Sequence, residues 1–137
     1  EDAVALAERN RQRLQLGNAS FLLSHWFSAL AGQRYGLILS NPPYIRADDR
    51  HLNEGDVRFE PSSALVAGSD GLDDIRAIIQ AAPQHLLSGG WLLLEHGFDQ
   101  APAVRALLQA HGFEAVTSRH DLAGIARCSG GQWPTAR

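Results

Sequence analysis

Residues 35–44 read YGLILSNPPY, and this stretch decides the fold that the sequence predicts. The first six residues form an apolar run of strand length, and Asn41 begins a stiff, proline-rich segment where that strand ends. Proline makes up about 5% of average composition, so two adjacent prolines between this Asn and this Tyr are rare by chance. Ligands of open parallel α/β sheets bind just beyond the carboxyl ends of strands. We therefore expect a functional site at residues 41–44.

The chemistry of residues 41–44 suits a planar group that bears an NH2. Asn41 and Pro42 each precede a proline and are biased toward extended backbone, and neither Pro42 nor Pro43 has an N–H group. The Asn41 side-chain oxygen and the Pro42 carbonyl are acceptors held close together, and the Tyr44 ring can cover the flat face of the guest. The alternative is a proline turn with Tyr44 packed on the core, and the residues alone leave both interpretations open.

The composition predicts a soluble, cytoplasmic chain with one core. The chain has 137 residues, of which 45% are hydrophobic. Its net charge of −3 and pI near 6.0 argue against sequence-independent nucleic-acid binding, which relies on clustered Lys and Arg. No apolar run approaches the ~20 residues of a membrane span, and no signal peptide opens the chain. Cys128 is the only cysteine and the six histidines lack paired ligand spacing, so we expect no metal site.

The spacing of apolar residues, glycines and prolines predicts an α/β fold. We expect helices over residues 1–16, from residue 71 to a break at Gly89-Gly90 with a kink at Pro83, and from Pro102 to a stop at Gly112. We expect strands over residues 20–24, 35–40, 91–95, 113–119 and 125–128. The last two strands are joined by a short turn, so they should form an antiparallel hairpin.

The sequence around the prolines resembles that of a known family. Asn-Pro-Pro-Tyr after a strand is similar to the motif of S-adenosylmethionine-dependent methyltransferases that act on planar amino groups. Residues 55–61 (GDVRFEP), 64–67 (ALVA) and 70–72 (DGL) are similar to the HemK/PrmC family, the glutamine-N5 methyltransferases of bacterial peptide-chain release factors. The resemblance runs over nearly the whole chain. It implies a Rossmann-like class I methyltransferase fold, S-adenosyl-L-methionine as cofactor, and the Gly-Gly-Gln motif of a release factor as substrate.

The resemblance also assigns roles to residues of this chain. Asn41 and Pro42 would hold the substrate amide, with Pro43 stiffening the segment and Tyr44 sandwiching the amide. Asn41 would also reach the cofactor. Trp26 matches a position that contacts the adenine of the cofactor; an aromatic residue after a strand can equally be core.

Two features depart from the family pattern or stay ambiguous. His25 stands where the family usually has an acidic residue, and a neutral histidine offers an adenine only one acceptor, in one tautomer. Arg58 and Glu60 match a loop that shapes the substrate side, but a salt bridge within the loop explains them equally well.

The resemblance begins only a few residues past the family's second strand. It implies a single, N-terminally truncated catalytic domain over residues 1–137, without the first two strands and their glycine-rich turn. We expect such a chain to be inactive alone, because strand ladders and apolar faces would lack their partners.

Several alternatives stay open at this stage. The related enzyme that modifies a glutamine of a ribosomal protein shares the chemistry, although residues 55–61 favour release factors. A DNA adenine-N6 enzyme is disfavoured by the acidic charge balance. From another class, the chain could be a non-catalytic remnant that needs a partner. Residues 130–132 happen to spell Gly-Gly-Gln themselves, which we interpret as coincidence.

Overall fold

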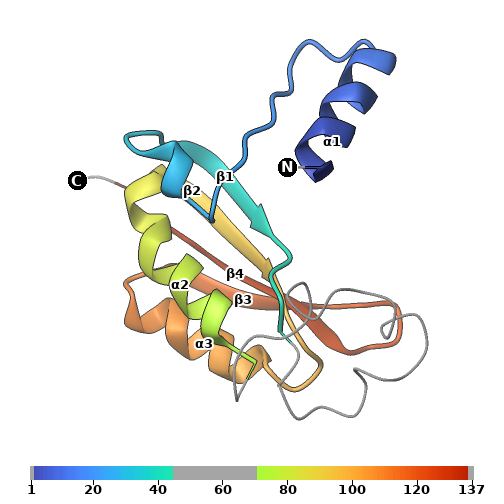
Figure 1. Cartoon of the computed structure of the whole chain (residues 1–137). Helices are drawn as coiled ribbons and strands as arrows, with labels where there is room; N and C mark the ends of the chain where they lie inside the picture. Colours follow the sequence, from blue (N-terminus) through green and yellow to red (C-terminus); the bar gives the residue numbers. More distant parts are fainter. Residues whose placement is uncertain (1, 45–70, 136–137) are drawn as a thin grey trace. The chain divides into compact units, whose positions relative to one another are not determined.

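The computed structural model describes residues 2–44 and 71–135, and Figure 1 shows its elements. The chain divides into two compact units, Glu1–Gln33 and Arg34–Arg137, which are described separately below. The prediction of a single catalytic domain stays a prediction. No helix in the described ranges is long and apolar enough to cross a membrane.

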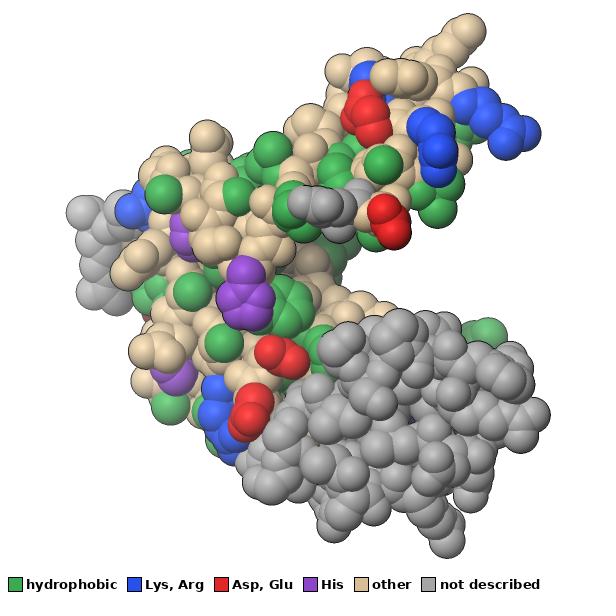
Figure 2. All heavy atoms as spheres, in the orientation of Figure 1, with side chains coloured by type: hydrophobic (Ala, Val, Ile, Leu, Met, Phe, Trp, Pro, Cys, Tyr) green, Lys and Arg blue, Asp and Glu red, His purple; other side chains and the backbone are tan. Residues whose placement is uncertain are grey.

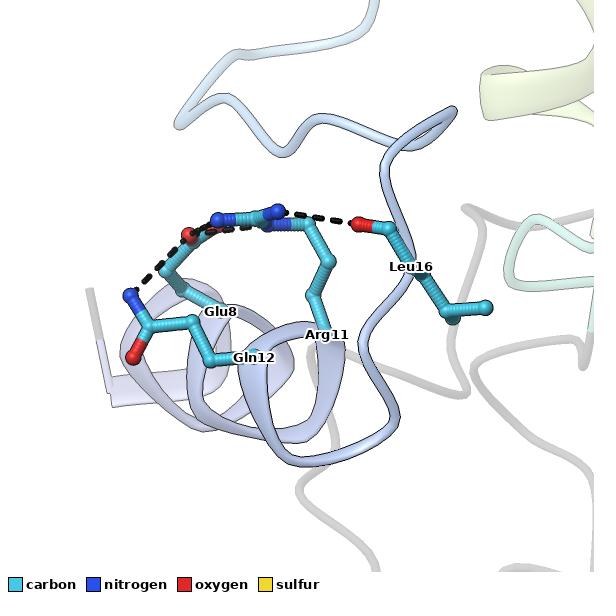
Figure 3. A network of polar contacts seen from close by, with 4 residues as sticks. All are labelled: Glu8, Arg11, Gln12 and Leu16. Atoms are coloured by element: carbon cyan, nitrogen blue, oxygen red, sulfur yellow. Dashed lines mark hydrogen bonds and ion pairs between the residues drawn. The ribbon is translucent and has the colours of Figure 1, made fainter.

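The first unit begins with helix α1, Asp2–Arg13, which carries a polar network on its surface. The Arg11 guanidinium donates to the Glu8 carboxylate, with an Nε–Oε1 distance of 2.9 Å, and to the Leu16 carbonyl, also at 2.9 Å (Figure 3). The hydrogen bond from Arg11 to Glu8 holds the pKa of the Glu8 carboxyl below its usual value. The helix ends three residues earlier than predicted, because residues 14–16 curl into a turn that Arg11 caps.

The surface of α1 is largely polar, as expected for a solvated helix face. Figure 2 shows Arg and Glu side chains on this helix with hydrophobic side chains between them, and the helix has no buried residue. Arg9 and Arg13 of this helix are exposed, whereas Arg11 is half-buried.

The predicted strand over residues 20–24 is wrong. These residues have no regular structure, and Leu22 and Leu23 are 60% and 61% exposed. A strand is stabilised by hydrogen bonds to a neighbouring strand, and no strand in the described part of the chain pairs with this segment. The 3-10 turn η1, Ser28–Leu30, follows it.

The second unit contains a four-stranded mixed sheet. Its strands are β1 (Tyr35–Ser40), β2 (Leu86–Glu95), β3 (Glu114–His120) and β4 (Ala126–Gln132). They follow the order β1-β2-β4-β3; β1 is parallel to β2, and the other two pairs are antiparallel. The α/β class with a C-terminal antiparallel hairpin is confirmed, and the parallel start followed by this hairpin fits a partial Rossmann-like fold.

The second predicted helix ends earlier than expected. Helix α2 spans Asp73–Ala81, a 3-10 turn η5 spans Ala82–His85, and β2 has already begun at Leu86. Gly89 and Gly90 therefore lie inside β2 and do not mark the end of the helix. The sheet register shifts opposite them, between Tyr35 and Leu37, and Gly89 has a φ of +78°. The pairing of β1 with β2 is therefore irregular at the glycines, and a glycine inside a strand commonly marks such a site.

The core lies between the sheet and two helices. Helix α3 spans Ala101–Ala110, with Pro102 in its first turn and Gly112, at φ +93°, just beyond its end, as predicted. Figure 1 shows α2 and α3 side by side against one face of the sheet. Among the described residues, the largest fully buried apolar side chains come from these two helices and from β2: Ile75, Ile78, Ile79, Leu86, Leu92, Leu94, Val104 and Leu108.

The opposite face of the sheet is not covered by any described residues of the second unit. Side chains alternate between the faces of a strand, so Leu37 and Leu39 of β1 point away from the helices and are 54% and 66% exposed. On β2, Trp91 and Leu93 occupy the same face and are half-buried.

Candidate functional site at the carboxyl end of β1

The proline segment lies directly beyond β1, where the sequence predicts it. Because β1 and β2 are parallel, their carboxyl ends share one edge of the sheet. Asn41 is exposed, Pro42 is buried, and Pro43 and Tyr44 are half-buried. The segment is thus anchored by Pro42 and presents the Asn41 side chain to solvent.

Tyr44 is held through its backbone. Its carbonyl accepts a hydrogen bond of 2.9 Å from Nε2 of Gln100, a residue that is only 5% exposed. A side chain at Gly71 would collide with that carbonyl, and one at Gly97 would come within 3.4 Å of the Tyr44 ring at Cδ2. The Tyr44 backbone therefore has a fixed place, with its ring close to the chain that follows β2.

A pocket of about 380 Å³ opens beside Asn41. It is lined by Leu39, Ser40, Asn41, Leu93, Glu95, Arg127 and Cys128. Pro42, Pro43 and Tyr44 do not line this pocket, so Asn41 is the predicted site residue that faces it. The convergence of the Asn41 and Pro42 oxygens on one guest stays a prediction.

The pocket is also lined by two charged side chains and one thiol, none of which is among the predicted site residues. Glu95 and Arg127 come from β2 and β4, which pair at this edge. Burial and the Glu95 charge raise the pKa of the Cys128 thiol. The thiol is therefore protonated near neutral pH and is poorly suited to act as a nucleophile.

The two predicted cofactor residues lie in the first unit. The exposed His25 ring and the half-buried Trp26 ring have centroids 6.1 Å apart. Ser24 organises this turn: its hydroxyl donates to the Trp26 carbonyl at 2.8 Å and accepts the Ala29 N–H at 2.9 Å. Trp26 has a φ of +53°, which is uncommon for an aromatic residue and is stabilised by these bonds.

A buried polar chain lies behind the site, at the end of β2. His96 is fully buried; its Nδ1 lies 3.0 Å from the Gly97 carbonyl and its Nε2 lies 2.7 Å from the Ser129 hydroxyl. Burial lowers the pKa of His96, although the hydrogen bond to the Gly97 carbonyl acts in the opposite direction. The imidazole is therefore neutral around pH 7.

Some predicted features lie outside the described residues. Arg58 and Glu60, and with them the family-like segments 55–61 and 64–67, fall in this category. Within the described ranges, no group of three His, Cys, Asp or Glu side chains could hold a metal ion. The Gly130-Gly131-Gln132 tripeptide lies inside β4, where Gln132 Nε2 donates to the Gly89 carbonyl at 3.0 Å. Its glutamine therefore has a structural partner.

The chain is similar to curated methyltransferases over nearly its whole length. The release factor glutamine methyltransferase of Pseudomonas aeruginosa is 66% identical over 133 residues, which cover 97% of this chain and 48% of that protein. The proteins of the same name from Yersinia pestis and Vibrio cholerae are 53% and 52% identical and are also covered to 48%. The predicted resemblance is confirmed, and the chain spans about half the length of the curated relatives it matches.

One solved structure is also similar. The crystal structure of a protein-(glutamine-N5) methyltransferase, release factor-specific, from Alicyclobacillus acidocaldarius matches with a TM-score of 0.49 and 27% identity. The match covers 75% of this chain and 51% of that one. No family model matches the chain.

Proposed function

The chain is homologous over almost its whole length to one half of the release factor glutamine methyltransferases, and from this premise we propose its function. It forms part of an S-adenosyl-L-methionine-dependent enzyme that methylates N5 of a glutamine in peptide-chain release factors, at their Gly-Gly-Gln motif. The proposal includes a cytoplasmic location, no membrane or nucleic-acid partner, and that residues 1–137 belong to a single catalytic domain.

The observation that carries this proposal is the position of Asn41. It is exposed, it lies at the carboxyl end of β1, and it lines a pocket at the sheet edge. Its side-chain oxygen can accept one N–H of a glutamine amide, and the Pro42 carbonyl can accept the other. Tyr44, half-buried with its backbone fixed, can cover the flat amide.

The chemistry follows from the poor nucleophilicity of an amide nitrogen, whose lone pair is delocalised into its carbonyl. The cofactor supplies an electrophilic methyl group on a sulfonium. Transfer of that methyl group would make the amide nitrogen more pyramidal and its N–H groups more acidic. Acceptors at Asn41 and Pro42 would then bind the transition state more tightly than the ground state. The proton leaves to solvent after the transfer, so no dedicated base is needed.

The first unit fits a role in holding the adenine. An adenine has a flat ring and an NH2 group; Trp26 offers an aromatic face, and the His25 ring can offer at most one acceptor. Asn41 is the third residue assigned to the cofactor. Because His25 replaces a carboxylate that could accept both amino hydrogens, we expect His25→Asp to tighten cofactor binding.

The experiment is transfer of a labelled methyl group to a release factor by the intact protein that carries this chain. We expect Asn41→Ala to lower kcat by about 100-fold, since misplacing a reacting group costs rates of this order. Asn18→Ala is the matched control, because Asn18 is exposed and lies in the turn after α1. Equal activity of the Asn41 variant and the control would contradict the proposal.

The same assay tests the alternatives. Labelling of a ribosomal protein in place of a release factor would favour the related enzyme, and labelling of neither would favour a non-catalytic remnant. Residues 1–137 alone should show no strong affinity for S-adenosyl-L-methionine in a calorimetric titration, and tight binding would refute the predicted inactivity of the fragment.

A further inference from the structure

Gln100 is a buried polar residue for which the proposed chemistry has no role. It immediately precedes α3 and is 5% exposed. A buried amide costs free energy unless its N–H and C=O groups find partners. The hydrogen-bond partners of the Gln100 amide therefore indicate which groups it positions.

The Gln100 amide joins two backbone segments. Its Oε1 accepts the Gly97 N–H at 2.7 Å, and its Nε2 donates to the Tyr44 carbonyl at 2.9 Å. A backbone N–H can only donate and a carbonyl can only accept, so the two partners fix the orientation of the amide. Tyr44, 56 residues away in sequence, is thereby held at a set distance from Gly97.

The residues around the Gln100 amide leave it little space to move. A side chain at Gly71 would approach Gln100 Nε2 to 2.7 Å and collide with the Tyr44 carbonyl. A side chain at Gly97 would approach Gln100 Oε1 to 3.1 Å. Two glycines thus let three backbone segments close around one amide.

Gly97 is itself anchored from the other side. Its carbonyl accepts the Gln100 backbone N–H at 3.1 Å and lies 3.0 Å from His96 Nδ1. Because that carbonyl is only an acceptor, Nδ1 carries the proton, and Nε2 of the neutral ring accepts from the Ser129 hydroxyl.

The chain of hydrogen bonds continues to α3. Ser129 Oγ lies 2.7 Å from Ser118 Oγ, and Arg105 donates to Ser118 Oγ at 2.7 Å. With Ser129 donating to His96, Ser118 must donate to Ser129. Each donor therefore points in the same direction, from Arg105 through Ser118 and Ser129 of the hairpin to His96 and Gly97. This network links Gly97, in the loop between β2 and α3, to helix α3 and to the β3–β4 hairpin.

We propose that Gln100 is a positioning residue that sets the place of the Asn41-Pro42-Pro43-Tyr44 segment through the Tyr44 carbonyl. This inference rests on the proposed function. The rigid diproline transmits the position of Tyr44 back to Asn41 and Pro42, whose φ-restricted backbone leaves few ways to absorb a shift. A displacement of about 1 Å at the acceptors can cost about 100-fold in rate.

The test is Gln100→Glu in the intact protein, with Gln109→Glu as matched control on the exposed end of α3. The ionised glutamate keeps an acceptor for Gly97 but turns a lone pair toward the Tyr44 carbonyl. We expect kcat to fall about 100-fold, the KM for S-adenosyl-L-methionine to stay within about twofold, and the control to match the wild type.

A pH profile separates positioning from a structural role. Once protonated, the introduced glutamate regains a donor for the Tyr44 carbonyl, so the ratio of Gln100→Glu to Gln100→Ala activity should rise as the pH falls. A constant ratio at every pH would overturn the proposal, and so would a kcat equal to that of the wild type. If the glutamate variant does not fold, Gln100→Met keeps the shape of the side chain without its polar groups and should show the same loss of kcat; wild-type kcat in that variant would also overturn the proposal.

A spectroscopic arm does not depend on catalysis. Carbonyl-13C tyrosine labelling of the intact protein gives signals for Tyr44 and Tyr35, each assigned by its absence from the Tyr44→Phe or Tyr35→Phe variant, and Tyr35 serves as an internal reference. Gln100→Glu should shift the Tyr44 signal and leave that of Tyr35 in place. An unmoved Tyr44 signal overturns the inference whatever the activity. If the wild type transfers no methyl group, the proposed function fails, and the Tyr44 signal alone decides whether Gln100 holds the segment.

Discussion

The two faces of the sheet are built from the same strands but differ in what covers them. On one face, Leu92 and Leu94 of β2 are fully buried under α2 and α3. On the other, Leu37 and Leu39 of β1 are more than half exposed, and Leu39 lines the pocket beside Asn41. The two faces therefore have different roles. The face that packs against α2 and α3 stabilises the second unit, and the opposite face borders the proposed site.

The largest expected effect comes from truncating equivalent leucines on the two faces. Leu94→Ala should destabilise the chain by about 2–5 kcal/mol, the usual cost of a cavity in a packed core. Leu39→Ala should change stability by about 0.5 kcal/mol or less, because the side chain is already 66% exposed. Urea denaturation followed by tryptophan fluorescence measures both. Equal losses would show that the second face is also packed.

Substitutions at two glycines measure how tightly the residues around Tyr44 are packed. Gly71→Ala should destabilise by about 1–3 kcal/mol, since φ is +78° and the new methyl group would meet the Tyr44 carbonyl. Gly124→Ala is the control, because its φ of +81° is similar but nothing lies within 4 Å. The difference between the two variants isolates the cost of crowding Tyr44. Identical losses in the same denaturation assay would mean that only backbone strain matters.

The covered side of the sheet should also be sensitive to acid. The pKa of buried His96 is lowered in the folded chain, so below pH about 6.5 the unfolded chain binds more protons than the folded one, and stability falls as the pH falls. The charged groups that act on His96 are Arg105 of α3, Arg127 of β4 and Glu95 of β2. His96→Asn should flatten the pH dependence of stability between pH about 5 and 7, whereas His120→Asn, an exposed control, should not.

The smallest effect concerns the thiol on the uncovered face. Because burial raises the pKa of Cys128, its alkylation at pH about 8 should be several-fold slower in the folded chain than in urea. As Cys128 is the only cysteine, mass spectrometry gives the rate directly. An equal rate in both conditions would place the thiol in full contact with water.

Local signals in the sequence predicted much of the fold. The run from Tyr35 to Ser40 became β1 with those bounds, and Pro102 and Gly112 bracket α3 as expected. The hairpin followed from the short turn at residues 121–124, where the Asp121 carboxylate accepts the N–H groups of Ala123 and Ile125. Each of these features depends on neighbours in sequence, which is why patterning found them.

Features that depend on distant partners were missed or misplaced. Residues 20–24 have strand-like composition, but a strand needs a neighbour that sequence patterning cannot supply. Gly89-Gly90 has the local pattern of a break, whereas the hydrogen bonds from the Gly89 N–H to the Trp133 carbonyl and from the Trp133 N–H to the Gly90 carbonyl keep the glycines inside β2. At the site, the position of Asn41 was predictable, but Gln100 was not, because one glutamine at the start of a helix gives no hint of a carbonyl 56 residues away.

The outer edge of β1 has a consequence for how molecules of this chain behave together. Within the described residues β1 pairs only with β2, so along its other edge the N–H and C=O groups of alternate residues have no described partner strand, next to two exposed leucines. Two molecules that meet edge to edge can extend one sheet across both, which gives attraction that grows with concentration. Light scattering should therefore show self-association of the purified chain, and a charged residue in place of Leu39 should suppress it.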